Sequence, residues 1–290
     1  MPPITATLYT DPGCPWAYSA IPALRVMEWR YGDGLRWRLV MIGLAEDPSR
    51  YLSRGYTPES VLAGHAVFRD RFGMPFSLPR KGRVTATGRG CRAVVAARLR
   101  DPGSEWAVLR ALQIANFTSP LMLDDDASVA AALDAAGLDG AGLVEAIADP
   151  EVEAAYQADR AEARAAGGSA AELQGKTATT DGPVRFTAPS VVFARDGARL
   201  VAGGWQPVEA YDVLVANLDP SLPRQAPPPD PGPLLERWPE GLVTREVALL
   251  MTRGNDAVDE AAAERALGDL VAAGRATRTT LGQSALWRAA

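Results

Sequence analysis

Residues 7–32 read TLYTDPGCPWAYSAIPALRVMEWRYG, and this stretch decides the fold. Residues 4–10 are β-branched, aromatic or apolar with no breaker among them, so they predict a short buried strand. The Asp-Pro-Gly sequence at 11–13 predicts a sharp turn, because proline fixes φ and glycine tolerates the bend. The following apolar residues predict a helix, with Pro15 in the first turn, where its missing N–H costs nothing.

This arrangement places the sulfur of Cys14 at the N-terminus of the predicted helix. Unpaired N–H groups and the positive end of the helix dipole stabilise a thiolate there. We therefore expect the pKa of Cys14 to lie below the ordinary value of about 8.5, which would make the thiolate a nucleophile. A buried structural cysteine after a turn is the alternative, and Cys-Pro-Trp-Ala does not exclude it by itself.

Two further prolines favour the interpretation of Cys14 as a nucleophile over that of a structural cysteine. Pro22 lies inside the predicted helix, where a proline is costly, and Pro189 opens the predicted strand FTAPSVVF at 186–193. With Cys14 at a strand–helix turn, these features resemble the thioredoxin fold. More narrowly, residues 4–218 resemble the DsbA family, close to its FrnE-like and 2-hydroxychromene-2-carboxylate isomerase-like branches. The sequence Gly204-Trp-Gln-Pro-Val-Glu209 matches the Gly-x-Gln-Pro-x-Glu signature of FrnE-like members.

The resemblance implies a division of the chain. Residues 35–42 alternate as a strand and complete a β-α-β unit, whose right-handed crossover predicts parallel strands. Residues 46–175 are mostly helical in pattern, where the family carries a helical insertion. The predicted fold class is α/β: a thioredoxin-like domain at 1–45 and 176–219, with a large helical insertion domain at 46–175.

A further small unit is predicted at the C-terminal end. Residues 220–233 are dense in proline and predict an extended linker. Residues 234–290 predict an α+β unit with helices at 244–251 and 256–274, Thr244 as an N-cap and a hairpin at 276–287. This order resembles a winged-helix domain. The second helix is strongly acidic and would repel phosphates, so packing against the main domain or a partner is favoured over nucleic-acid binding.

Composition limits the function classes. The 290 residues carry a net charge of −5, which argues mildly against nucleic acid, and no apolar run approaches the ~20 residues that span a bilayer. The N-terminus lacks an export signal and the chain has two cysteines, so we expect a cytoplasmic protein without a disulfide scaffold. With one histidine and two separated cysteines, no metal site is predicted.

Cys91 and His65 each allow a functional and a structural interpretation. Cys91 could resolve a mixed disulfide at Cys14, but its apolar helix favours a small buried hydrophobe. We predict that Cys14 and Cys91 form no disulfide. His65, the only histidine, has the side chain best suited to general base catalysis near neutral pH, but its helix supports packing or solvent exposure equally well.

The functional hypothesis follows from position 17. The family's dithiol oxidases carry Cys-x-x-Cys, and Ala17 stands where the second cysteine would be, so exchange within the motif is excluded. The resemblance implies a thiol oxidoreductase that acts through Cys14 alone and a cis proline at 189. The residues implied in binding thiol or substrate are Pro15, Trp16, Ala17, Ala188, Pro189 and Ser190.

No tightly bound cofactor is predicted. A low-molecular-weight thiol, glutathione- or mycothiol-like, is the expected cosubstrate, with a small-molecule or protein thiol as substrate. The sequence leaves open whether the chain forms a homodimer. The alternatives are a thiol-dependent isomerase or S-transferase acting on a small hydrophobic electrophile, and a non-enzymatic binding or regulatory protein.

Overall fold

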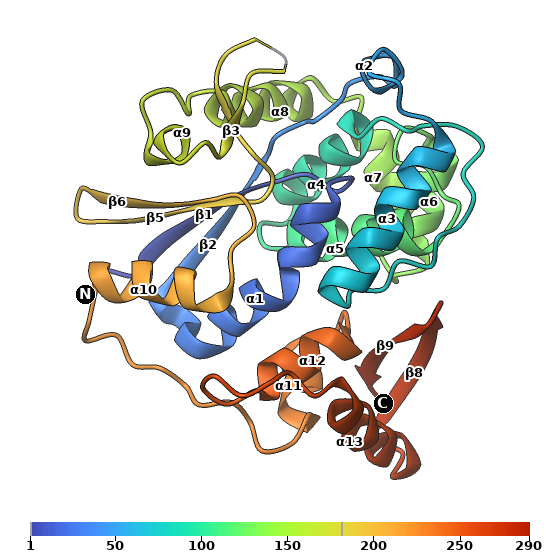
Figure 1. The fold of residues 1–290 in the computed structure, drawn as a ribbon. Coiled ribbons are helices and arrows are strands. Elements are labelled where there is room, and N and C mark those ends of the chain that lie inside the picture. Colours follow the sequence, from blue (N-terminus) through green and yellow to red (C-terminus); the bar gives the residue numbers. More distant parts are fainter. Residues whose placement is uncertain (1, 181) are drawn as a thin grey trace.

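The central element is a four-stranded sheet in the order β2-β1-β5-β6. A computed structural model describes residues 2–180 and 182–290. β1 (Ile4–Thr10) pairs in parallel with β2 (Leu35–Met41), and β5 (Ser190–Arg195) pairs antiparallel with β1 and with β6 (Ala198–Gly203). β1 is buried almost throughout, as its apolar and β-branched residues predict. Its C-terminal end leads into the turn before Cys14 (Figure 1).

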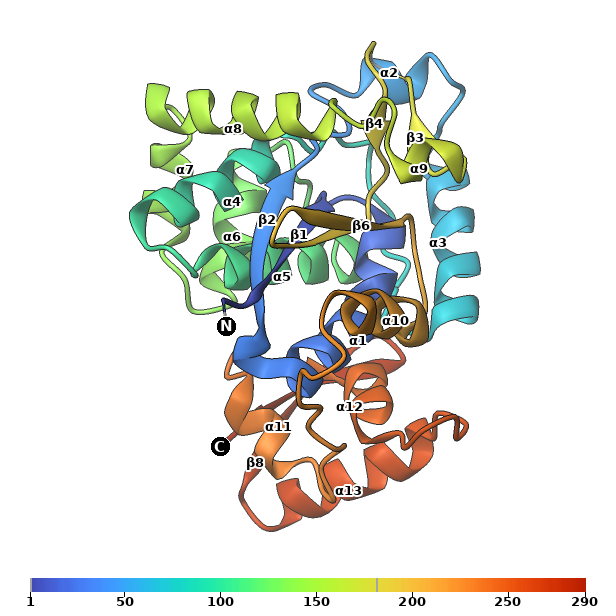
Figure 2. The ribbon, with the colours of Figure 1, turned by 90° about the vertical axis from the view of Figure 1, so that its left-hand side faces the viewer.

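Helix α1 (Pro15–Tyr31) makes the crossover between the two parallel strands. It is buried along most of its length, Pro22 included, and a 3₁₀ turn (Gly32–Gly34) joins it to β2. α10 (Val208–Leu218) packs beside α1 and against β5 and β6 (Figure 2). The β-α-β unit predicted from the sequence is therefore present.

The segment between β2 and β5 is mainly helical, as predicted. Short polar side chains cap several helices: Thr57, Asp125, Asp139 and Asp149 each accept a hydrogen bond from an N–H of the first turn. The elements are α2 (Ser49–Leu52), α3 (Pro58–Phe72), α4 (Gly88–Arg100), α5 (Glu105–Thr118), α6 (Asp126–Asp134), α7 (Gly140–Ala146), α8 (Pro150–Ala163), α9 (Ala170–Leu173), β3 (Thr177–Ala178) and β4 (Arg185–Phe186). The division into domains stays a prediction.

The C-terminal unit has the element order that the sequence suggested. It consists of α11 (Gly232–Arg237), β7 (Leu242–Val243), α12 (Thr244–Met251), α13 (Glu260–Ala272), β8 (Ala276–Leu281) and β9 (Ser284–Ala289), with sheet order β7-β9-β8. The prediction of Thr244 as the N-cap is wrong by one residue: Val243 is the cap, and the Thr244 hydroxyl accepts from Trp287 Nε1. The likeness to winged-helix domains stays a prediction.

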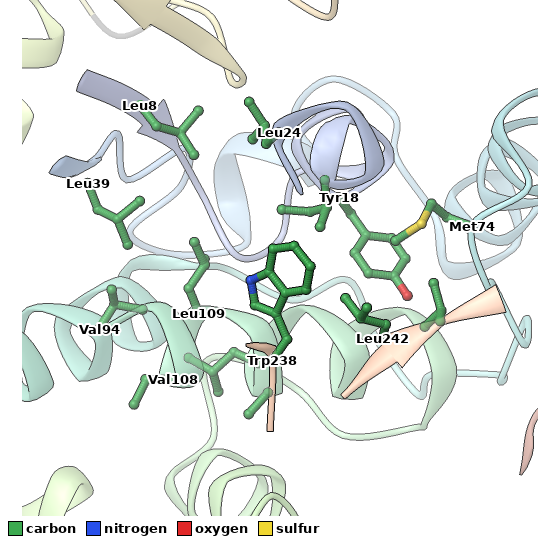
Figure 3. Packing of buried hydrophobic residues seen from close by; sticks show 14 of the residues in the cluster. Leu8, Tyr18, Leu24, Leu39, Met74, Val94, Val108, Leu109, Trp238 and Leu242 are labelled. Atoms are coloured by element: carbon green, nitrogen blue, oxygen red, sulfur yellow. The ribbon is translucent and has the colours of Figure 1, made fainter. Parts of the chain in front are cut away.

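This unit shares the core of the rest of the protein. Trp238 and Leu242 lie among side chains of α1 and α5, including Leu24 and Leu109 (Figure 3). At the same interface Arg110 of α5 forms a buried ion pair with Glu246 of α12, with Nη1 to Oε1 at 2.6 Å. The unit therefore packs against the main domain, which is the use that its acidic second helix favoured.

Candidate active site

Cys14 is the N-cap residue of α1. Its φ of −85° and ψ of 115° are extended, its N–H donates to Asp11 O at 3.1 Å, and its carbonyl accepts from Tyr18 N at 3.0 Å. The turn at 11–13 therefore holds the sulfur over the first turn of the helix, as the sequence predicted. Only 6% of the residue is exposed, so the thiol lies just beneath the surface.

The residues just before β5 contact the same sulfur. The Ala188–Pro189 peptide bond is cis, the isomer that the resemblance implied. Cys14 Sγ donates to Ala188 O at 3.1 Å, across 174 residues of sequence. Ser190 is fully buried, and its hydroxyl donates to Thr187 O at 2.7 Å and accepts from Gly204 N at 3.2 Å. Ser190 thus links the strand to the Gly-Trp-Gln-Pro turn. No described hydrogen bond joins its hydroxyl to the Cys14 thiol.

The remaining predicted residues surround Cys14 unequally. Ala17 is buried in the first turn of α1, Pro15 is half-buried, and Trp16 is 40% exposed. The Trp16 ring lies edge-on against Phe68 and Phe72 of α3, with centroid distances of 4.9 and 5.6 Å. Trp16 therefore joins the cysteine turn to the helical segment, and part of its ring faces solvent.

The expectation of a lowered pKa at Cys14 is wrong. Burial raises the pKa of the Cys14 thiol from 9.0 to about 12, and the charge of Asp11 adds to this rise. The N–H groups of Ala17 and Trp16 and the cation of Arg185 act in the opposite direction, but they do not balance the loss of water. The resting sulfur is therefore a protonated thiol, in agreement with its hydrogen bond to Ala188 O.

Labelling should reveal this protonation. Raising a thiol pKa from 9.0 to about 12 lowers the thiolate fraction near pH 7 about a thousandfold. In the Cys91→Ser variant we expect iodoacetamide to label Cys14 far more slowly than a free thiol at pH 7, with a rate still rising beyond pH 10. A rate that levels off at or below pH 8.5 would show that the helix N–H groups outweigh burial.

Asp11 is a functional candidate that the sequence analysis treated only as a turn residue. It is fully buried, and its carboxylate accepts from Gly13 N (2.9 Å), Leu44 N (2.8 Å), Thr87 Oγ1 (2.9 Å) and Cys91 Sγ (3.5 Å). Burial raises its pKa, while these donors oppose the rise. A polar residue three positions before the cysteine was the only signal for it.

The Cys91 thiol lies against the Asp11 carboxylate. Its thiol is fully buried on α4, and burial together with Asp11 raises its pKa well above the ordinary value. Both cysteines are free. Cys91 therefore fits the interpretation as a small buried residue, and the absence of a bridge to Cys14 in solution stays a prediction.

A cavity of about 400 Å³ opens beside the cysteine turn. Pro15 and Trp16 of α1, His65 and Phe68 of α3 and the loop at 79–87 contribute to its walls. Burial and the nearby ammonium of Lys81 lower the pKa of His65 to about 4, so His65 is neutral near pH 7. No described hydrogen bond links His65 to Cys14, so the geometry does not make it the base for this thiol.

Residues 2–180 and 182–290 contain no group of three or more His, Cys, Asp or Glu side chains arranged to hold a metal ion. Within those same ranges, every helix is too short or too polar to cross a bilayer.

The site and the fold together define a class: a thioredoxin-type sheet whose helix-capping cysteine meets the residue before a cis proline. A profile of the DSBA-like thioredoxin domain matches residues 5–168, more than half of the chain. The chain belongs to the DSBA-like thioredoxin domain family. Among curated proteins, no sequence matches it.

Solved structures share this fold at low sequence identity. The cytosolic disulfide reductase DsbM of Pseudomonas aeruginosa is 22% identical with a TM-score of 0.52, and the match covers 75% of this chain and 100% of DsbM. The probable DsbA oxidoreductase of Streptomyces coelicolor is 21% identical with a TM-score of 0.55, covering 75% of this chain and 91% of that one. A structure of DsbM with GSH has a TM-score of 0.50 at 21% identity, covering 74% of this chain and 98% of that one.

Proposed function

We propose that this protein is a thiol–disulfide oxidoreductase that works through Cys14 alone, with a low-molecular-weight thiol as cosubstrate. The observation that carries the proposal is the 3.1 Å contact between Cys14 Sγ and Ala188 O, beside the cis proline, in a motif with Ala17 at the position of a second cysteine. A single thiol in such a site exchanges disulfides with outside thiols, since no partner sulfur is available within the motif.

The exchange balances without a further reactant. Cys14 attacks one sulfur of a disulfide RS–SR, which forms Cys14–S–SR, and the proton of the Cys14 thiol leaves with the departing RSH. A second thiol R′SH then attacks the SR sulfur, which gives R′S–SR and returns the proton to Cys14. The net reaction oxidises R′SH at the expense of RS–SR and leaves the protein unchanged.

The raised pKa gives Ala188 O a role in this cycle. At rest this carbonyl accepts the hydrogen of the Cys14 thiol, whose protonated form is favoured by burial. A substrate that pairs with the backbone at Ala188 in the manner of a strand donates its own N–H to the same carbonyl. The sulfur then loses its acceptor and faces the N–H groups of Trp16 and Ala17, which favour the thiolate.

The proposed class of cosubstrate rests on structural similarity. The DsbM structure with GSH is consistent with a glutathione-like thiol, and a mycothiol-like thiol meets the same chemical requirement. Ala188 and Pro189 would line its binding site, while Pro15 and Trp16 would line that of the second substrate. A small-molecule or protein thiol would be the second substrate, and a cytoplasmic location suits a site that depends on a thiol pool.

Mass spectrometry of the intact protein tests this function. After incubation with glutathione disulfide at pH 8, we expect one glutathione per chain on Cys14, released by a second thiol. The Cys91→Ser variant should form the same adduct and the Cys14→Ser variant none. An adduct on Cys91 of the native protein, or an unmodified Cys14 after prolonged incubation, would refute the proposal.

A second candidate is a thiol-dependent isomerase or S-transferase acting on a small hydrophobic electrophile. The observation that favours it is the apolar-walled cavity of about 400 Å³ beside the cysteine turn, which a protein-thiol oxidoreductase does not need. Transfer of glutathione to an electrophile without disulfide exchange would favour this candidate.

A further inference from the structure

The cavity beside Cys14 has the dimensions of a small-molecule site. Its volume of about 400 Å³ lies within the range of about 300–1,000 Å³ that is usual for ligand pockets. Trp16, Tyr51, Tyr56 and Phe68 supply aromatic walls, and Gly13 and Pro15 bring the wall up to the residues flanking Cys14. A flat apolar molecule would therefore find contact surface beside the turn that holds Cys14.

One cation in this wall lacks a carboxylate partner among the described residues. Lys81 Nζ donates to Asn116 Oδ1 at 2.8 Å and to the carbonyl of Leu121, and both acceptors are neutral. An ammonium has three donors, so one remains for a ligand. A largely buried charge is costly unless it is paired, and the desolvation lowers the pKa of Lys81 to about 8.

The acidic group whose charge acts on Lys81, Asp124, is already hydrogen-bonded to other residues. Asp124 binds Arg83 through two hydrogen bonds, at 2.6 and 2.9 Å, and also accepts from Thr85 Oγ1 and Ala86 N. Its four donors hold its carboxylate away from Lys81, which it influences only through space. The excess positive charge at this end of the cavity therefore belongs to Lys81.

We propose that this cavity binds the second substrate R′SH, a small flat apolar thiol with one anionic group, which Lys81 holds while the apolar body lies against Trp16. The proposal deepens the proposed function and rests on it for the role of substrate. The thiol cosubstrate has a separate place, because it pairs with the backbone at Ala188. Two separate binding positions near Cys14 would let R′SH attack the mixed disulfide that the cosubstrate forms on Cys14, which releases the Cys14 thiol.

Two fluorescent dyes of matched shape test the charge requirement. Anilinonaphthalene sulfonate is flat, apolar and anionic, and phenylnaphthylamine is its neutral counterpart without the sulfonate. Affinity for each is measured at pH 7 in the full chain, where Lys81 is protonated. We expect Lys81→Met to weaken binding of the anionic dye about tenfold or more and to leave the neutral dye within about twofold.

Controls separate this effect from misfolding. Arg80→Met removes a neighbouring cation whose side chain is 85% exposed and should change neither affinity. Lys81→Arg keeps the charge and should restore much of the binding of the anionic dye. Unchanged affinity of the anionic dye in Lys81→Met would overturn the proposal, as would failure of both dyes to bind the native protein.

The outcome is independent of the thiol chemistry. Binding is repeated in the Cys14→Ser variant, which should keep its affinity for both dyes. If glutathione disulfide fails to modify Cys14 while the dyes still discriminate at Lys81, the oxidoreductase function is refuted and the anion site stands. Displacement of the anionic dye by reduced glutathione in competition would assign the cavity to the cosubstrate and overturn the proposal.

Discussion

Replacing Ala17 with cysteine is expected to shorten the lifetime of a mixed disulfide on Cys14 about a hundredfold or more. The new thiol would stand in the first turn of α1, where the N–H of residue 17 already acts on the Cys14 sulfur. An attack within the chain has a high effective concentration, so it outcompetes thiols in solution. The product is an internal disulfide between residues 14 and 17, found by peptide mapping without reductant.

The matched control is Ala17→Ser, which adds a group of similar size without a second sulfur. Ala17 is 1% exposed and packs in the small core cluster around Cys14, so both substitutions cost some stability. The mixed disulfide should persist in Ala17→Ser as in the native protein. Equal lifetimes in Ala17→Cys and Ala17→Ser would show that the first turn of α1 does not hold residue 17 within reach of the sulfur.

Glu246→Gln is expected to lower the free energy of unfolding by about 3–5 kcal/mol. Glu246 is fully buried and Arg110 nearly so, and removing one charge leaves the other buried and uncompensated. The double variant Arg110→Met with Glu246→Gln should recover most of the loss, since it removes the stranded charge. The amide oxygen of Gln can still accept the bond that Val243 N–H now donates at 2.7 Å.

Urea unfolding of Glu246→Gln, of the double variant and of Glu260→Gln measures these differences in the free energy of unfolding. Glu260→Gln is the control, because it breaks the more exposed ion pair with Arg245 and should cost less than about 1 kcal/mol. A single variant at Glu246 that is no less stable than Glu260→Gln would mean that water reaches Arg110 when its partner is lost.

Local signals in the sequence were enough to predict the strand, turn and helix that hold Cys14. The β-branched run of β1, the Asp-Pro-Gly turn and the proline at position 15 each act on their own neighbours, so strand, turn and helix followed in order. The helical character of residues 46–175 was also predicted, because capping residues and apolar periodicity are local signals. Pro189 was placed by resemblance and not by any local rule.

The electrostatics of the site could not be predicted in the same way. The pKa of Cys14 depends on burial by segments far along the chain, including the residues around Ala188, and on the charge of the neighbouring Asp11. A helix N-terminus alone predicts a lowered pKa, and only the completed packing reverses its direction. Lys81 lies in a loop without periodicity, so nothing in the sequence placed it in the cavity wall.

The shared core of α1 and the C-terminal unit has a consequence for biosynthesis. Leu24 leaves the ribosome early, whereas Trp238 and Leu242, which cover the same core, are translated more than about two hundred residues later. At about 5–20 residues per second, the helix that Cys14 caps waits roughly 10–40 seconds for these partners. Throughout that interval the nascent chain carries an uncovered apolar surface, which is buried only after Trp238 and Leu242 have emerged.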